Sequence, residues 1–257
     1  MALFNGSVFS KVLPMETGLT VILPGDRLFG TAHKPSKVLY LLHGLTDNNA
    51  AWSRYTSIDR YIREHNVAVI MPEGHHSFYL DEKLGVKFYT YITKELPSLV
   101  ADMFAVSSKP EDTYIAGLSM GGYGALRCML MNPQGYNGCG AFSAMVDMEA
   151  YASETAHDPF TSRIAQTLFG KTGEIPEDAS LFKLAEKNVR EGNKLPEIYI
   201  TCGRQDFLYK QNLKFNDHLN ALGIDHTFEA WDGTHEWGFW DRSVKNMIDR
   251  FFVEKKN

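Results

Sequence analysis

Short apolar runs alternate with helical patterns along most of this chain, and that alternation limits the folds open to it. The runs are hydrophobic throughout, as are strands buried on both faces of a parallel sheet. They cover 38–42, 67–71, 114–116, 139–142, 198–201 and 226–230. An earlier pair, 11–13 and 19–23, is expected to be antiparallel because a turn-like segment joins it. Repeated strand–helix–strand units imply a mostly parallel sheet with helices on both faces, so the predicted class is α/β.

The length of 257 residues fits one domain of the larger kind, spanning 1–257. One stretch, 144–195, interrupts the alternation with weak helical patterns and no convincing strand. It would leave the sheet at its carboxyl edge, where ligands bind in open α/β folds. We interpret it as a small helical, cap-like insertion, and a surface decoration is the alternative.

Composition excludes several classes of partner. The formal net charge is −5 and no basic stripe is present, which argues against nucleic acid. No run approaches the roughly 18 apolar residues of a membrane span, and the first residues do not read as a signal peptide. Cys128, Cys139 and Cys202 are widely spaced among apolar residues, as buried reduced thiols are. We therefore expect a soluble, cytoplasmic protein with no nucleic-acid or membrane partner.

A serine flanked by glycines stands at the expected end of one strand. Gly117-Leu-Ser-Met-Gly121 follows an apolar run and precedes a helix rich in small residues. A serine at a sharp strand-to-helix turn has strained backbone, and glycines on either side avoid clashes there. The turn also brings the Met120 N–H and the positive helix end beside the Ser119 hydroxyl. Ser119 is predicted to be a nucleophile, with Met120 N–H as one oxyanion donor.

Such a serine needs a base, and the base needs a carboxylate that fixes its tautomer. The expected chain order is nucleophile, acid, histidine, each just after a strand. His235 stands between the last strand and a closing helix, and Asp206 follows the preceding strand. Asp232 and Asp241 compete as the acid, but Asp232 lies on the same short loop as the histidine. The predicted triad is Ser119, Asp206 and His235.

The second oxyanion donor is expected on the loop after the run 38–42, which reads His43-Gly44-Leu45. The glycine lets this loop turn in close, so that the Leu45 N–H can pair with that of Met120. His43 is interpreted as an organiser of the loop rather than as a second base.

Large aromatic residues are candidates for a pocket wall. Trp52, Phe78 and Trp237 could line an acyl or aromatic pocket, although residues of this kind are more often core. His75 and His76 are adjacent, and neighbouring histidines do not easily share one metal ion. We predict a small-molecule ester as the partner, no metal and no cofactor; homo-oligomers are compatible with the sequence on general grounds.

Several of these segments together resemble the esterase D-like serine esterases, which have the α/β-hydrolase fold. The resemblance runs through most of the chain. It is carried by Leu41-Leu-His-Gly-Leu-Thr-Asp-Asn, Met71-Pro-Glu-Gly, Ser77-Phe-Tyr, Lys94-Glu-Leu-Pro, Ala116-Gly-Leu-Ser-Met-Gly-Gly-Tyr-Gly-Ala and the His235 loop. It is similar above all to bacterial tributyrin and acetyl esterases, whose members cleave short-chain acyl esters and sometimes feruloyl esters. The resemblance implies the same roles for the triad, Leu45 and Met120.

The S-formylglutathione hydrolase branch of the family is the nearest alternative. That branch usually has a cysteine after its His-Gly-Leu-Thr stretch and histidines near the nucleophile, where this chain has Asp47, Leu118 and Tyr123. We therefore predict a serine carboxylesterase that cleaves acetyl and butyryl esters through an acyl-enzyme. A feruloyl or cinnamoyl esterase and an S-formylglutathione thioesterase remain the alternatives. The residues do not separate hydrolysis from acyl transfer to a second alcohol, and the intact triad argues against a non-catalytic binding module.

Overall fold

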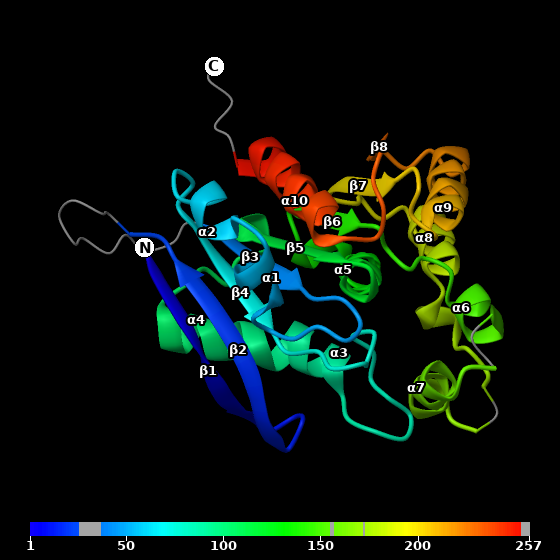
Figure 1. Ribbon diagram of the computed structural model, residues 1–257, viewed down its shortest axis with the longest axis horizontal. Helices are drawn as coiled ribbons and strands as arrows, with labels where there is room; N and C mark the ends of the chain where they lie inside the picture. Colours follow the sequence, from blue (N-terminus) through cyan, green and yellow to red (C-terminus); the bar gives the residue numbers. More distant parts are fainter. Residues whose placement is uncertain (26–36, 155–156, 172, 253–257) are drawn as a thin grey trace.

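Eight strands form one sheet through the centre of the protein (Figure 1). The computed structural model describes residues 1–25, 37–154, 157–171 and 173–252. The strand order is β1-β2-β4-β3-β5-β6-β7-β8; β2 pairs antiparallel with both β1 and β4, and all the other pairs are parallel. The strands are β1 (Ala2–Ser10), β2 (Met15–Leu23), β3 (Lys37–Leu42), β4 (Val67–Pro72), β5 (Thr113–Leu118), β6 (Gly138–Phe142), β7 (Glu197–Gly203) and β8 (Thr227–Trp231). The predicted α/β class and mostly parallel sheet are confirmed.

The first strand differs from the prediction. The antiparallel pair exists, but β1 is Ala2–Ser10, and residues 11–14 form the turn between the two strands. The backbone N–H groups of Lys11 and Val12 donate to the Glu95 carboxylate, at 2.8 and 3.3 Å, instead of to a strand. Nearly all of β1 is exposed, so it lacks the apolar run by which the other strands were recognised.

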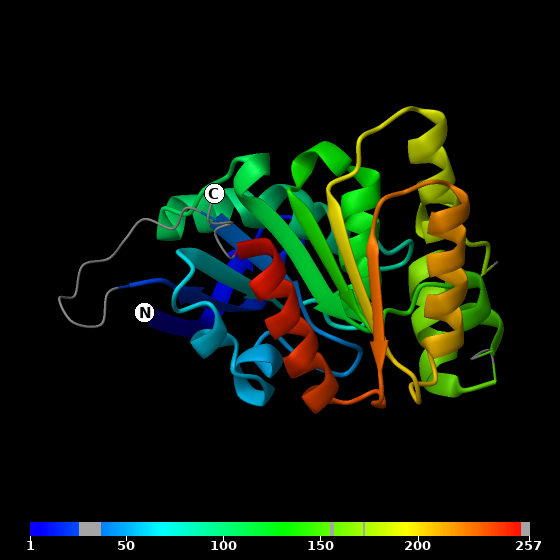
Figure 2. The same ribbon diagram turned by 90° about the horizontal axis from the view of Figure 1, so that it is seen from above.

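Helices cover both faces of the sheet (Figure 2). They are α1 (Ala51–Tyr55), α2 (Ile58–Tyr61), α3 (Phe88–Thr90), α4 (Leu96–Phe104), α5 (Met120–Met131), α6 (Met148–Glu154), α7 (Pro159–Phe169), α8 (Leu181–Arg190), α9 (Tyr209–Ala221) and α10 (Trp237–Phe252). One core joins the sheet to α1, α2 and α10, and the other joins it to α3, α4, α5, α6, α7, α8 and α9. No helix in the described part of the chain has the length and apolar character of a membrane span.

The insertion at 144–195 contains α6, α7, a 3-10 turn (Glu177–Ala179) and α8, and its described residues include no strand. Its second half is bound to α5. Tyr123 donates to Ala179 O at 2.7 Å, Arg127 pairs with Asp178 at 2.6 Å, and Asn188 donates to a carbonyl of α5 at 2.8 Å. These contacts make α8 part of the helical layer over the sheet. Only α6 and α7 are left as candidates for a cap, and that role stays a prediction.

Candidate active site

Ser119 lies in a sharp turn between β5 and α5. Its backbone has φ 51° and ψ −115°, a conformation that costs a non-glycine residue on the order of 1–3 kcal/mol. The two flanking glycines leave room for this turn. A Cβ atom on Gly117 would lie 2.4 Å from the backbone of Gly121, and one on Gly121 would lie 2.4 Å from the Leu42 carbonyl oxygen. The local sequence therefore builds the turn that was predicted for it.

The structure brings the three residues of the predicted triad together. His235 Nε2 lies 3.1 Å from Ser119 Oγ, and His235 Nδ1 lies 2.8 Å from Asp206 Oδ2. Asp206 follows β7, and His235 lies between β8 and α10, so the groups meet at the carboxyl edge of the sheet. The Asp206 side chain is fully buried, whereas His235 is 20% exposed. This geometry suits proton transfer from Ser119 Oγ to His235 Nε2, with Asp206 accepting the Nδ1 proton.

The environment keeps Asp206 ionised. Burial opposes ionisation, but hydrogen bonding and charge attraction from His235, together with the Leu208 N–H, lower the pKa of Asp206 below its usual value. The competing acids lie elsewhere: Asp232 pairs with Arg204 on the surface, and Asp241 accepts hydrogen bonds from Ser57 N and Tyr61. Asp206 is the carboxylate that touches His235.

The predicted oxyanion donors are backbone N–H groups in the segments that follow β3 and β5, which are neighbouring strands. Met120 is the first residue of α5, where a backbone N–H has no acceptor within the helix. Leu45 lies in the loop after β3, and its N–H has no hydrogen-bond partner among the described residues. Acyl transfer uses a pair of backbone N–H groups of this kind to hold an oxyanion, so the assignment of Leu45 and Met120 stays a prediction.

Comparison with known proteins shows the family to which the chain belongs. Residues 10–251 match the model of the Esterase family, described as "Putative esterase". The chain belongs to this family. The esterase is 32% identical to an acetyl esterase from Caldicellulosiruptor saccharolyticus, with 97% of each chain covered.

Two solved structures from Staphylococcus aureus are also similar to the esterase. The fluorophosphonate-binding serine hydrolase FphF is 34% identical, with a TM-score of 0.89 and 98% and 99% of the two chains covered. The S-formylglutathione hydrolase FrmB is 35% identical, with a TM-score of 0.85 and 97% and 98% covered. The α/β-hydrolase fold and the class of enzyme are thereby established: the protein is a serine hydrolase of carboxylic esters.

The aromatic residues predicted to line a pocket do not all reach the site. Trp52 and Phe78 are each only 1% exposed. Trp52 donates to the Leu42 carbonyl at 2.9 Å, and Phe78 packs against Tyr151, with ring centroids 4.9 Å apart. Because other groups already occupy their surfaces, both belong to the core instead of to an open pocket wall. Trp237 is half-buried at the start of α10 and keeps some free surface.

One aromatic residue at the site was missed from the sequence. Phe207 is 74% exposed, and its ring centroid lies 4.6 Å from that of His235. The only signal available in the sequence was its place directly after Asp206. An exposed ring beside the imidazole offers an apolar surface to a bound ester.

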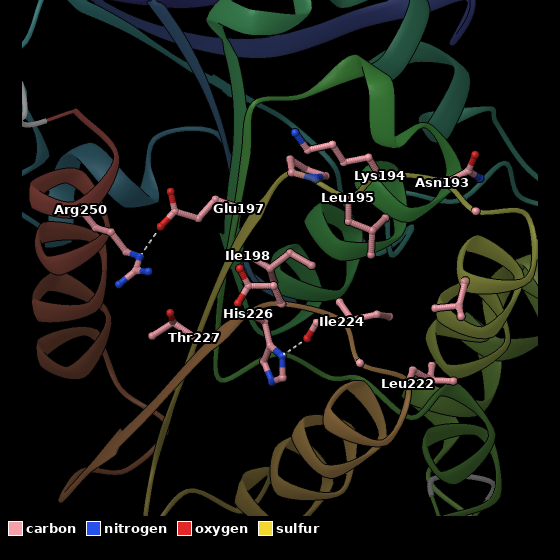
Figure 3. Close-up of a pocket in the computed structure, with 15 residues that line it drawn as sticks. Asn193, Lys194, Leu195, Glu197, Ile198, Leu222, Ile224, His226, Thr227 and Arg250 are labelled. Carbon is pink, nitrogen blue, oxygen red and sulfur yellow. Dashed lines mark hydrogen bonds and ion pairs between the residues drawn. The ribbon is translucent and has the colours of Figure 1, made fainter.

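A cavity of about 750 Å³ lies at the opposite edge of the sheet (Figure 3). It is lined by Glu197 and Thr227, which begin β7 and β8, and by the loops that lead into them. The triad follows the carboxyl ends of the same strands, so this cavity is separate from the catalytic site. Among the described residues no cluster of three metal-ligating side chains occurs, and His75 and His76 belong to none.

Proposed function

We propose that Ser119 is the nucleophile of this esterase, that His235 is its general base and that Asp206 orients the imidazole. In the first step His235 Nε2 takes the Ser119 proton while Oγ attacks the ester carbonyl carbon. The Leu45 and Met120 N–H groups hold the oxyanion that forms. As the tetrahedral intermediate collapses, the C–O bond to the alcohol breaks and His235 gives its proton to the leaving oxygen.

The second step returns the enzyme to its starting state. A water molecule gives one proton to His235 Nε2 and attacks the acyl carbon. The bond to Ser119 Oγ then breaks, the acid leaves, and the proton returns to Oγ. The observation that carries this proposal is the hydrogen-bonded chain from Ser119 Oγ through His235 to the buried Asp206.

We propose acetyl and other short-chain acyl esters as the substrates. The acetyl esterase likeness, which extends over 97% of both chains, supports this choice. S-formylglutathione is a second candidate, because FrmB is similar over nearly the whole chain. Asp47 weighs against it: this half-buried carboxylate lies near His43 and His235, and a negative charge there disfavours an anionic thioester. The three buried free cysteines support a cytoplasmic location.

A panel of substrates tests the proposal. We expect kcat/KM for p-nitrophenyl esters to be highest for acetate or butyrate and to fall towards laurate. Methyl ferulate tests the feruloyl-esterase alternative, and S-formylglutathione tests the thioesterase alternative. A preference for laurate, methyl ferulate or S-formylglutathione would reject the short-acyl assignment.

The nucleophile is tested separately with a fluorophosphonate probe. The wild-type enzyme should be labelled at Ser119, and a Ser119→Ala variant should show neither labelling nor ester hydrolysis. Labelling that persists in this variant would remove Ser119 from its proposed role.

A further inference from the structure

The ring of Phe207 is left in solvent beside the imidazole of His235. Phe207 is 74% exposed. The centroids of the two rings lie 4.6 Å apart, and the angle between the ring planes is 49°. Apolar surface in contact with water is unfavourable, and a ligand that covers it recovers that free energy. Phe207 therefore offers an apolar binding surface directly beside a side chain that is proposed to move a proton.

The chain around Phe207 is held in place by hydrogen bonds. Before it, Gln205 N donates to the Gly233 carbonyl at 3.1 Å, and Gly233 N donates to Gln205 Oε1 at 2.8 Å. After it, Leu208 N donates to Asp206 Oδ1 at 2.9 Å. These bonds tie the segment to the loop that carries His235 and to the buried carboxylate. A ring on a fixed backbone loses little conformational entropy when a ligand binds, so more of the contact energy contributes to binding.

Other groups already orient the imidazole of His235. Asp206 Oδ2 lies 2.8 Å from its Nδ1, and the Asp206 side chain is fully buried. The indole of Trp240, which is 5% exposed, packs edge to face against the imidazole with ring centroids 4.8 Å apart. Both contacts come from inside the protein. They leave the exposed ring of Phe207 available to a ligand.

The path of the proton decides which part of an ester lies against Phe207. In the proposed reaction Ser119 Oγ attacks the acyl carbon, and His235 Nε2 then gives its proton to the oxygen of the leaving alcohol. That oxygen must lie within hydrogen-bonding distance of Nε2, so the alcohol part of the ester lies beside the imidazole. A ring in contact with the imidazole therefore faces the alcohol part of the ester and not its acyl chain.

We infer that Phe207 binds the alcohol part of the substrate and selects esters whose alcohol carries an aryl or similar flat apolar group. Such a group packs against a phenyl ring, whereas an alcohol as small as ethanol covers little of it. The inference rests on the proposed roles of Ser119 and His235, and it goes beyond them because it concerns the alcohol. Phe207 determines specificity in this scheme and takes no part in making or breaking bonds.

Three esters that differ in where they carry bulk test this inference. Benzyl acetate has a ring on its alcohol, ethyl butyrate has a longer acyl chain, and ethyl acetate has neither. Benzyl alcohol and ethanol have similar acidity, so the first and last of these esters differ mainly in the ring. For the wild-type enzyme we expect kcat/KM to be higher for benzyl acetate than for ethyl acetate.

Replacing Phe207 by alanine should remove this preference. We expect Phe207→Ala to lower kcat/KM for benzyl acetate by about three- to tenfold, the range that one aromatic contact supplies, and to change the other two values by less than about twofold. Because the ring is exposed, the variant should fold as the wild type does. A wild-type enzyme without the preference, or a variant that keeps it, would contradict the inference.

Two further variants are controls. Phe9→Ala removes another exposed phenyl ring, which is 62% exposed on β1, at the edge of the sheet away from β7. It should leave kcat/KM for all three esters unchanged. Phe207→Tyr keeps an aromatic ring at the site and should keep the preference for benzyl acetate. A preference that Phe9→Ala lowers as much as Phe207→Ala does would contradict the inference.

A role in positioning His235 would have a different signature. It would lower kcat/KM for the three esters equally, and it would slow the reaction of Ser119 with diisopropyl fluorophosphate. This reagent loses fluoride and brings no aryl group to the site, but its reaction still needs Ser119 to be activated by His235. We expect the second-order rate constant of this reaction in Phe207→Ala to stay within about twofold of the wild type. A tenfold loss would overturn the inference.

The same reagent separates the two proposals. A wild-type enzyme that does not react at Ser119 would reject the proposed function and with it the role of Phe207. An enzyme that reacts there, but whose preference for benzyl acetate over ethyl acetate does not change in Phe207→Ala, would reject only the further inference.

Discussion

Several residues directly after the parallel strands have strained backbone conformations. Thr46, His75, Ser119 and Ser143 come after β3, β4, β5 and β6, and each has a positive φ. Hydrogen bonds to neighbouring strands hold the two serines in place: Ser119 N donates to Phe142 O at 2.9 Å, and Ser143 N donates to Thr201 O at 2.7 Å. Strain of this kind persists where surrounding contacts hold the backbone in its strained conformation, as they do at catalytic sites.

The role of Asp206 can be tested by Asp206→Asn. The amide keeps the size of the side chain but no longer favours the His235 tautomer that can accept the Ser119 proton. We expect kcat for p-nitrophenyl acetate to fall by about 10⁴-fold with the fold intact. Asp232→Asn, on the surface near His235, should leave kcat unchanged. Equal losses in the two variants would show that Asp206 is not the orienting acid.

Glu73 should also make the stability of the protein depend on pH. Its pKa is about 2 in the folded state against a model value of 4.5, so the folded state favours its ionised form. The ionised Glu73 therefore adds about 3 kcal/mol to the free energy of unfolding. This stabilisation is fully present well above the pKa of Glu73 in the unfolded state, and it is lost as the pH falls through the pKa in the folded state. Urea unfolding should show Glu73→Gln less stable than wild type at about pH 7, with the gap narrowing below about pH 5. A gap that stays constant with pH would contradict this.

Individual site residues differ in how well the sequence reveals them. Ser119, Asp206 and His235 could be found because each follows a strand in an expected order. Glu73 had no assigned role, because its contact with His43 joins loops after two strands that are neighbours only in the sheet. Phe207 was missed because exposure of a ring depends on how loops pack, which one sequence does not show.

At the scale of elements, the turn from β5 into α5 tolerates no added side chain. A Cβ atom on Gly121 would lie 2.4 Å from the Leu42 carbonyl oxygen and 2.6 Å from that of His43, and backbone atoms cannot move aside cheaply. We expect Gly121→Ala to lower the free energy of unfolding by about 3 kcal/mol or more and to abolish activity. Urea unfolding measures the first effect and ester hydrolysis the second. A stable, active variant would contradict the geometry of this turn.

The elements near Pro97 show what periodicity can and cannot predict. Apolar residues recur at three- and four-residue spacing over 88–104, a pattern that predicts one long amphipathic helix with a kink at Pro97. The structure has α3, a π-helical turn (Tyr91–Glu95) and α4 in unbroken succession. Proline has no N–H to donate to the carbonyl four residues earlier, and the chain widens just before it. The helix was predictable, but the form of its irregularity depends on local hydrogen bonding.

At the scale of the whole molecule, the central sheet and its two helical layers followed from alternation of strand and helix patterns. The strand β1 could not be predicted in this way, because it is exposed and has no continuous apolar run. The described residues of 144–195 form helices and no strand, and α8 belongs to the helical layer. Whether α6 and α7 cover a bound ester, and whether copies of the chain associate, stay predictions.

The cysteines provide a probe of the whole fold. Cys128, Cys139 and Cys202 are free and buried, and burial raises the pKa of the Cys128 and Cys202 thiols to about 12. A thiol reacts as its thiolate, so a thiol reagent such as Ellman's should react slowly with the native protein. All three thiols should react once the protein is unfolded in denaturant. Rapid reaction in the native state would show that the core opens readily.

The most direct test of the catalytic account is to trap the acyl-enzyme. The wild-type enzyme is mixed with p-nitrophenyl acetate, quenched in acid within the first turnover, and digested for mass spectrometry. The account predicts an acetyl group on the peptide that contains Ser119, formed more slowly in Asp206→Asn and absent in Ser119→Ala. An acetyl group on another residue, with none on Ser119 while ester is being hydrolysed, would contradict it.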